Sequence, residues 1–128
     1  MEKEKKTVLL VDDDVYVHGT FDAENPFEDK INVLHFYSSK DALNYLRTNK
    51  VHLIISCIRF PAPGDIDGIH FLRECKELYP RLPFIMHTAY PRRDDFSVWA
   101  SDAYIVKSSD YSELFKAVEK LLGLTICI

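Results

Sequence analysis

The stretch VHLIISCIRFP, residues 51–61, decides how this chain is expected to fold. Its centre, residues 53–57, is a short apolar run rich in β-branched side chains, which is typical of a buried strand. The run opens into a loop that contains Pro and Gly, and a strand of this kind commonly presents its last side chain to a functional site. That last side chain is Cys57, so the chemistry of a thiol at this position is the central question.

Four further apolar runs predict strands of the same kind, and they are residues 7–11, 32–36, 84–88 and 103–106. Helical patterns separate them. Strands that alternate with helices form parallel sheets covered on both faces, with right-handed crossovers. The sequence therefore predicts an α/β fold in which one domain spans residues 1–128, a length that supports one core.

Polar residues are expected to cap three of the helices. Ser39 and Asp67 each precede apolar residues at helical spacing. Asp110 and Glu113 resemble a capping box, and Gly123 is expected to end the last helix.

The first connection gives a weaker helical signal. A helix that begins near Val15 meets Gly19 after four residues and Asn25-Pro26 after ten. We therefore expect a short or irregular first helix.

Composition excludes several classes of protein. The net charge of -4, without a basic stripe, argues against direct binding of nucleic acid. The N-terminus is charged and no apolar run reaches membrane-spanning length, so we expect a cytoplasmic protein with no membrane contact. Three cysteines without C-x-x-C spacing argue against a disulfide framework and a zinc site.

Polar side chains end or directly follow four of the predicted strands, at the edge where parallel sheets bind ligands. They are Asp12, Asp13, Asp14, Cys57, Thr88 and Lys107. Each has an ordinary structural role as well, since aspartates cap helices and a lone cysteine is often a small buried hydrophobe. Adjacent carboxylates favour a hard divalent cation, whereas Lys and Thr suit phosphoryl oxygens. Their joint placement indicates a site.

Motifs in the same order resemble the receiver domain of bacterial two-component response regulators. They are LLVDDD at residues 9–14, LIISCIRFP at residues 53–61, Asp67-Gly68, HTAY at residues 87–90 and YIVK at residues 104–107. The resemblance implies a flavodoxin-like three-layer sandwich with five parallel strands in the order 2-1-3-4-5.

The resemblance also implies roles for the site residues. Asp12 and Asp13 match the acidic pair that holds Mg²⁺, Thr88 and Lys107 the groups that sense the phosphoryl group, and Tyr104 the switch aromatic. Cys57 stands where the family carries its phosphoacceptor aspartate.

A cysteine at that position alters the expected chemistry. A thiol has no carboxylate oxygen for an acyl phosphate, and thiolate is a soft ligand that suits Mg²⁺ poorly. We therefore expect weakened Mg²⁺ binding and no enzymatic activity. The predicted function is that of a stand-alone pseudo-receiver in two-component signalling, which acts through a histidine kinase, another regulator or a second copy of itself.

Other departures from the family surround the site. Ser108 follows Lys107 where the family usually has proline, the loop at residues 61–67 is longer than usual, and the segment between Thr88 and Lys107 is shorter.

Two alternatives remain open from the sequence. One is a thiol sensor, in which Lys107 would lower the pKa of Cys57 while the neighbouring aspartates would raise it. The other is a phosphatase of the haloacid dehalogenase type, which uses a similar set of Asp, Thr and Lys. Asp12 and Asp14 fit its opening motif, but Tyr16 does not, and no acidic pair follows Lys107 on a later strand.

Overall fold

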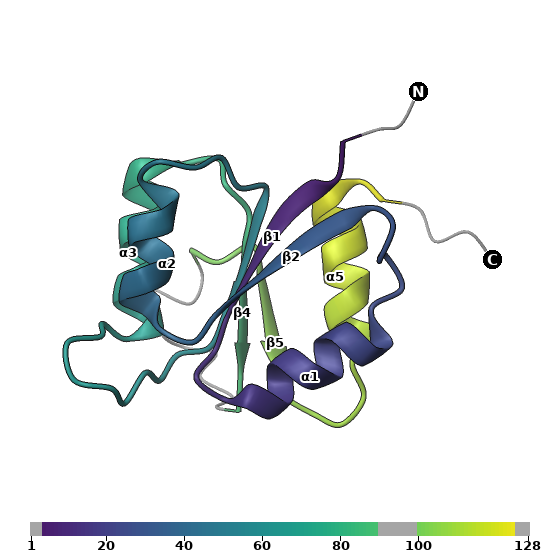
Figure 1. Cartoon of the computed structure of the whole chain (residues 1–128), viewed down its shortest axis with the longest axis horizontal. Helices are drawn as coiled ribbons and strands as arrows, with labels where there is room; N and C mark the ends of the chain where they lie inside the picture. Colours follow the sequence, from purple (N-terminus) through teal and green to yellow (C-terminus); the bar gives the residue numbers. More distant parts are fainter. Residues whose placement is uncertain (1–3, 90–99, 125–128) are drawn as a thin grey trace.

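The computed structural model describes residues 4–89 and 100–124 of the chain (Figure 1). Five strands form one parallel sheet in the order β2-β1-β3-β4-β5. Their bounds are β1 Lys6–Val11, β2 Ile31–Phe36, β3 Leu53–Ser56, β4 Phe84–Thr88 and β5 Ala103–Val106. The predicted α/β class and flavodoxin-like strand order are confirmed.

Helices cover both faces of the sheet. The four helices in the described residues are α1 Val15–Glu24, α2 Ser39–Leu46, α3 Gly68–Leu78 and α5 Ser112–Leu122. Figure 1 shows α2 and α3 together on one side of the sheet and α1 and α5 on the other. None of these helices combines the length and apolar character that crossing a bilayer requires.

Two apolar clusters fill the space between the layers. Along β1, Val8 and Leu10 belong to the cluster beneath α1 and α5, whereas Leu9 and Val11 belong to the one beneath α2 and α3. Because successive side chains of a strand point to opposite faces, a strand buried on both sides is apolar at every position. This is why β1, β3 and β4 each contain consecutive apolar residues, at positions 8–11, 53–55 and 84–86.

The expectation of a short or irregular first helix is wrong. Helix α1 runs for ten residues through Gly19 and ends at Asn25. The Asp14 carboxylate accepts a hydrogen bond from the Tyr16 amide and caps the helix, and the fully buried Phe21 holds it to the core. Packing of the buried face outweighs the helix-weakening effect of one exposed glycine.

Two of the predicted caps are also shifted. Ser38, not Ser39, caps α2, while Ser39 is buried and donates to the Ile66 carbonyl at 2.8 Å. The N-cap residue of α5 is Tyr111, whose side chain makes no capping hydrogen bond, and Asp110, one residue earlier, accepts from the amide of Ser112, the first residue of the helix. The predicted cap Asp67 and the left-handed Gly123 are confirmed.

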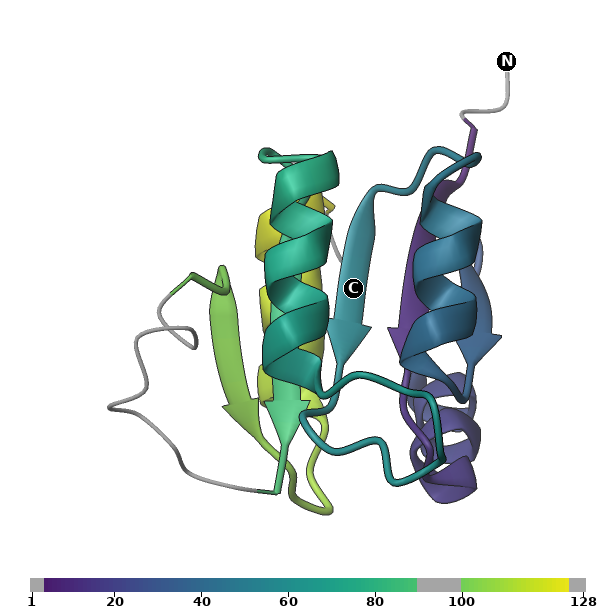
Figure 2. The same ribbon diagram turned by 90° about the vertical axis from the view of Figure 1, so that its left-hand side faces the viewer.

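The loop between β3 and α3 is attached to the start of α2. Ser38 Oγ donates to Asp65 Oδ1 at 2.6 Å, beside the contact between Ser39 and Ile66. Figure 2 shows this loop at the end of the sheet where the arrowheads lie. The loop therefore forms one wall of the edge at which ligands bind in such sheets.

Part of the sequence lies outside the described residues. Tyr90 of the HTAY motif falls there, as does most of the segment between Thr88 and Lys107 that we expect to be short.

Candidate functional site

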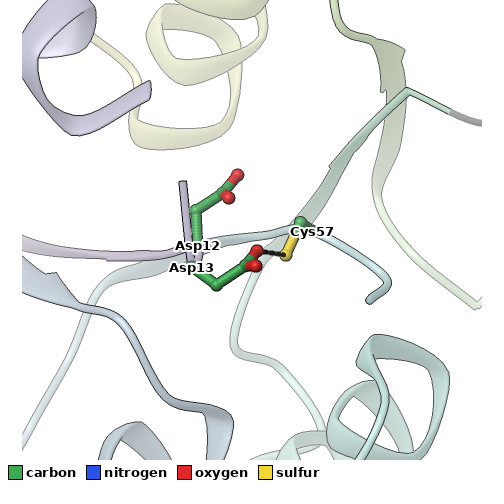
Figure 3. Close-up of side chains that lie close together, drawn as sticks. All are labelled: Asp12, Asp13 and Cys57. Carbon is green, nitrogen blue, oxygen red and sulfur yellow. Dashed lines mark hydrogen bonds between the residues drawn. The ribbon is translucent and has the colours of Figure 1, made fainter. Parts of the chain in front are cut away.

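The ends of β1 and β3 bring three of the predicted site residues together. Val11 pairs with Ser56 in the sheet, so Asp12, Asp13 and Cys57 follow neighbouring strands at the same level. One ligand atom from each lies within 4.8 Å of the others. Figure 3 shows the Asp13 carboxylate directed towards the Cys57 sulfur, with the Asp12 carboxylate turned to the opposite side. These three residues are called the acidic pocket below.

Lys107 forms an ion pair with Asp12. Its Nζ lies 2.8 Å from Asp12 Oδ2, and the Asp12 side chain is only 1% exposed. Burial by itself lowers the pKa of Lys107, but the hydrogen bond and charge of Asp12 outweigh burial, so this pKa lies above its ordinary value. The lysine therefore stays charged and compensates a carboxylate that is removed from water.

Cys57 holds a protonated thiol. Burial raises its pKa well above the ordinary value, Asp12 raises it further, and Lys107 offsets only part of the rise. The sulfur lies 3.2 Å from the Arg59 carbonyl oxygen and 3.9 Å from Asp13 Oδ1. A thiol has one hydrogen to donate, and the shorter contact assigns it to the Arg59 carbonyl.

The other predicted residues, Thr88 and Tyr104, lie on β4 and β5, the two strands beyond β3 in the sheet. Thr88 is buried at the end of β4, and its carbonyl accepts from the Lys107 amide at 2.7 Å. Tyr104 lies opposite Met86 in the sheet and packs, partly buried, against the cluster beneath α2 and α3. Thr88 and Lys107 thus lie at the carboxyl ends of two adjacent strands. Tyr104 lies two residues before the end of β5.

Two neighbours of Cys57 were not identified from the sequence as parts of the site. One is the Arg59 carbonyl, whose position depends on the conformation of the loop after β3 and is not indicated by any residue pattern. The other is Gly68, whose first side-chain carbon would lie 2.1 Å from the Cys57 carbonyl oxygen if any other residue replaced it. Asp67-Gly68 was recognised as a motif, but this close approach of α3 to the pocket is what requires glycine.

The backbone of Asp12 is also held by a contact with a histidine. His18 Nε2 lies 2.8 Å from the Asp12 carbonyl oxygen, and His18 Nδ1 lies 2.6 Å from His35 Nδ1. His35 Nε2 in turn lies 2.9 Å from the Asp22 carboxylate. Burial lowers the pKa of His18, which favours a neutral ring. This network joins α1 and β2 to the backbone of the acidic pocket.

A second buried histidine lies next to Thr88 on β4. His87 is 2% exposed, its Nδ1 is buried without a hydrogen-bond partner, and its ring packs edge-on against Tyr111 at 5.6 Å between centroids. Burial, with a smaller effect of Lys107, lowers the pKa of His87 to about 4. His87 is therefore a neutral ring within the core at neutral pH.

The acidic pocket contains some of the groups that a hard cation requires. Carboxylates from Asp12 and Asp13 and the Arg59 carbonyl are oxygen donors of the kind that Mg²⁺ prefers. Cys57 contributes a protonated sulfur in place of a further oxygen, and Lys107 already neutralises Asp12. The donor set is acidic, but it fits Mg²⁺ incompletely.

Comparison with known families gives one match over most of the chain. The model of the response regulator receiver domain matches residues 8–119. A curated relative, the transcriptional regulatory protein ZraR of Salmonella typhimurium, is 33% identical over 98% of this chain and 28% of its own length. The DNA-binding transcriptional regulator NtrC of Proteus hauseri is 29% identical over 93% of the chain and 25% of its own length. The chain thus spans about a quarter of these relatives.

Solved structures agree with the fold. The response regulator protein TrrA of Thermotoga maritima, in complex with Mg(2+)-BeF, has a TM-score of 0.82 at 30% identity, over 91% of this chain and 99% of that one. TrrA in complex with the histidine kinase ThkA has a TM-score of 0.76 at 32% identity, over 91% of this chain and 98% of that one.

The strand order, the strand-end site and the family match over residues 8–119 lead to the same conclusion. This chain belongs to the family of response regulator receiver domains of two-component signal transduction.

Proposed function

We propose that this receiver domain is a stand-alone pseudo-receiver in two-component signal transduction, which signals through protein contacts without aspartyl phosphorylation. One observation carries the proposal: a buried, protonated thiol occupies the end of β3, between Asp13 and the Arg59 carbonyl. A neutral thiol provides no carboxylate oxygen to attack a phosphodonor. The domain is proposed to act as a signalling module and not as an enzyme.

Mg²⁺ is proposed to bind this domain only weakly. Asp12, Asp13 and the Arg59 carbonyl would hold the ion, which would supply positive charge beside the phosphoryl position. Cys57 adds no hard ligand, and the ion pair with Lys107 has to be loosened before Asp12 can bind a cation. Thr88 and Lys107 are proposed to occupy the positions that sense the phosphoryl group in phosphorylated receivers, and Tyr104 the position of the switch aromatic.

The proposed partner is a protein: a histidine kinase, another regulator or a second copy of this chain. Support comes from TrrA, whose structure is known in complex with the kinase ThkA. The net charge of -4 argues against direct contact of this domain with nucleic acid. Because the family match covers residues 8–119, we propose that residues 1–128 form a single receiver-like domain able to act by itself.

The thiol-sensor alternative is disfavoured by the same geometry. Reactive cysteines are exposed and have a lowered pKa, whereas Cys57 is 4% exposed and its pKa is raised. Cys75 is a matched comparison, since it is also buried and burial raises its pKa to about 12. We expect alkylating reagents to modify both cysteines equally slowly in the folded protein.

The decisive experiment compares the native protein with Cys57→Asp by intact mass after incubation with Mg²⁺ and acetyl phosphate. The native protein should gain no phosphoryl group. The variant should bind Mg²⁺ more tightly by calorimetry, because a third carboxylate joins the pocket. Cys57→Asp combined with Asp13→Asn is the matched control, since it keeps the new carboxylate and removes a neighbouring one.

A stoichiometric phosphoryl group on the native protein, mapped to Asp12, Asp13 or Asp14, would contradict the proposal. Equal and negligible Mg²⁺ affinity in the native protein and in Cys57→Asp would contradict the assigned metal ligands.

A further inference from the structure

A groove lies at the end of the sheet opposite the acidic pocket. It is formed by the loop that joins α2 to β3 and the loop that joins α3 to β4, and it has a volume of about 840 Å³. Figure 2 shows these two connections at the end away from the arrowheads. A volume of this size lies within the range of about 300–1,000 Å³ found for binding sites. We call it the basal groove.

Positive charge surrounds the basal groove. Arg47, Lys50 and Arg81 line it, and no Asp or Glu does so among the described residues. The three cations are exposed, and none forms an ion pair with a residue in the described part of the chain. The chain as a whole has 20 acidic and 16 basic residues and so a negative net charge. The residues that line the basal groove include three cations and no carboxylate, so their net charge has the opposite sign.

Apolar surface is exposed in the same place. Leu78 and Tyr79, at the end of α3, are 40% and 39% exposed, and both line the basal groove. The Tyr79 hydroxyl donates to the Leu46 carbonyl at 2.7 Å, which fixes the ring between α2 and α3. An apolar surface held rigid by a hydrogen bond costs little conformational entropy when a partner covers it.

We propose that the basal groove binds an acidic segment of a partner protein, in which carboxylates flank one large apolar side chain. The apolar side chain packs on Leu78 and Tyr79, and the carboxylates meet Arg47, Lys50 and Arg81. Arginine recognises carboxylates through paired hydrogen bonds, which gives such a contact direction as well as charge. The charge pattern excludes a basic segment.

This surface is independent of the acidic pocket. Its residues lie at the amino ends of β3 and β4, whereas Asp12, Cys57 and Lys107 lie at the carboxyl ends. Binding at the groove therefore requires neither Mg²⁺ nor phosphorylation, and its failure would leave the proposed function untouched.

The test selects peptides from a phage-displayed library of random linear sequences on the full chain. The combined variant Arg47→Glu, Lys50→Glu and Arg81→Glu serves as the counter-target. Selected peptides should carry Asp or Glu on both sides of a Leu or an aromatic residue. By fluorescence anisotropy, the variant should bind the best peptide about tenfold more weakly or worse, since three exposed charge contacts are reversed.

A matched control reverses three exposed lysines elsewhere, Lys40→Glu, Lys116→Glu and Lys120→Glu, and so changes the net charge equally. The control and Asp13→Asn should bind the peptide like the native protein, and Leu78→Ser should bind it more weakly. Circular dichroism checks that each variant is folded. Selected peptides without acidic enrichment, an equal loss in the control, or no peptide that discriminates against the variant would each overturn the proposal.

Discussion

The two ends of the sheet handle charge in opposite ways. At the carboxyl end, Asp12 is buried and paired with Lys107 at 2.8 Å, and Cys57 is kept neutral beside them. At the amino end, Arg81 and Lys50 are exposed, and neither has an ion-pair partner in the described residues. The two ends meet on β3, since Lys50 lies in the loop that precedes this strand and Cys57 directly follows it.

The difference separates charges that support the fold from charges that are available for recognition. A buried charge destabilises the protein unless a partner compensates it, so each member of a buried pair depends on the other. Exposed charges contribute little to stability because water already solvates them. Substitutions at the two ends should therefore have very different effects on the free energy of unfolding.

The largest effect is expected from Lys107→Ala. The substitution leaves the Asp12 carboxylate 1% exposed and without its cation. We expect the free energy of unfolding to fall by about 3–5 kcal/mol, measured by urea denaturation at neutral pH. Replacing both partners, by Asp12→Asn with Lys107→Met, should cost less than the single substitution. A double variant that is less stable than Lys107→Ala would show that the pair does not explain the loss.

His87 should produce the next largest effect, as a dependence of stability on pH. Its pKa is about 4 in the folded protein and 6.5 for the unperturbed group, so between these values the unfolded chain binds the additional proton. Stability due to His87 is complete above about pH 6.5 and is lost as the pH falls towards 4, by roughly 3 kcal/mol in total.

Urea denaturation of the native protein and of His87→Leu at pH 7 and about pH 4.5 isolates this contribution. Leucine removes both the titrating ring and the unpartnered Nδ1, so the variant should lose less stability on acidification. His18 has a lowered pKa as well and remains in both proteins, which makes the difference specific to His87. Parallel losses in the two proteins would mean that His87 does not titrate as described.

A pair of glycines tests how tightly the carboxyl end is packed. In Gly68→Ala the new methyl group would meet the Cys57 carbonyl oxygen at 2.1 Å and Ile58 Cα at 2.7 Å, and backbone atoms cannot move aside locally. We expect a loss of about 1–3 kcal/mol. Gly19→Ala has open space around the new group, and should gain about 0.5–1 kcal/mol because alanine favours the helix. Thermal unfolding of both variants measures the contrast, and a stable Gly68→Ala would contradict it.

The smallest effects are expected in the basal groove. Lys50→Ala and Arg81→Ala remove exposed cations without ion-pair partners in the described residues, so each should change the free energy of unfolding by less than about 0.5 kcal/mol. Urea denaturation beside Lys107→Ala provides the comparison. A loss of several kcal/mol at either position would mean that the amino end also depends on its charges for folding.

Most of the fold could be predicted from the sequence because strands buried on both faces leave a continuous apolar signal. Residues 53–57 and 84–88 each begin with such a run, and the strands end within one residue of the predicted bounds. The errors concern the helices: α1 is longer and more regular than expected, and the caps of α2 and α5 are shifted. Ser38 and Ser39 have the same side chain, and only the position of the loop that contains Ile66 decides which of the two caps α2.

The sequence predicts which residues meet at the strand ends of the candidate site, but not how deeply they are buried or which other residues they contact. The rule that carboxyl ends meet at one edge brings Asp12, Asp13 and Cys57 together, as their 4.8 Å cluster shows. The near-complete burial of Asp12 and its contact with His18 depend on how α1 packs on β2. Sequence periodicity contains no information on this packing, and α1 was the helix with the weakest signal.

The two histidines behind Asp12 determine the direction of each other's hydrogen bonds. His18 Nε2 faces the Asp12 carbonyl oxygen, which only accepts, so this nitrogen carries the hydrogen of the neutral ring. His18 Nδ1 is then an acceptor, and the hydrogen between the two Nδ1 atoms, which lie 2.6 Å apart, belongs to His35. The backbone carbonyl of Asp12 thus sets the direction of the hydrogen bonds across both rings, from β2 to the end of β1.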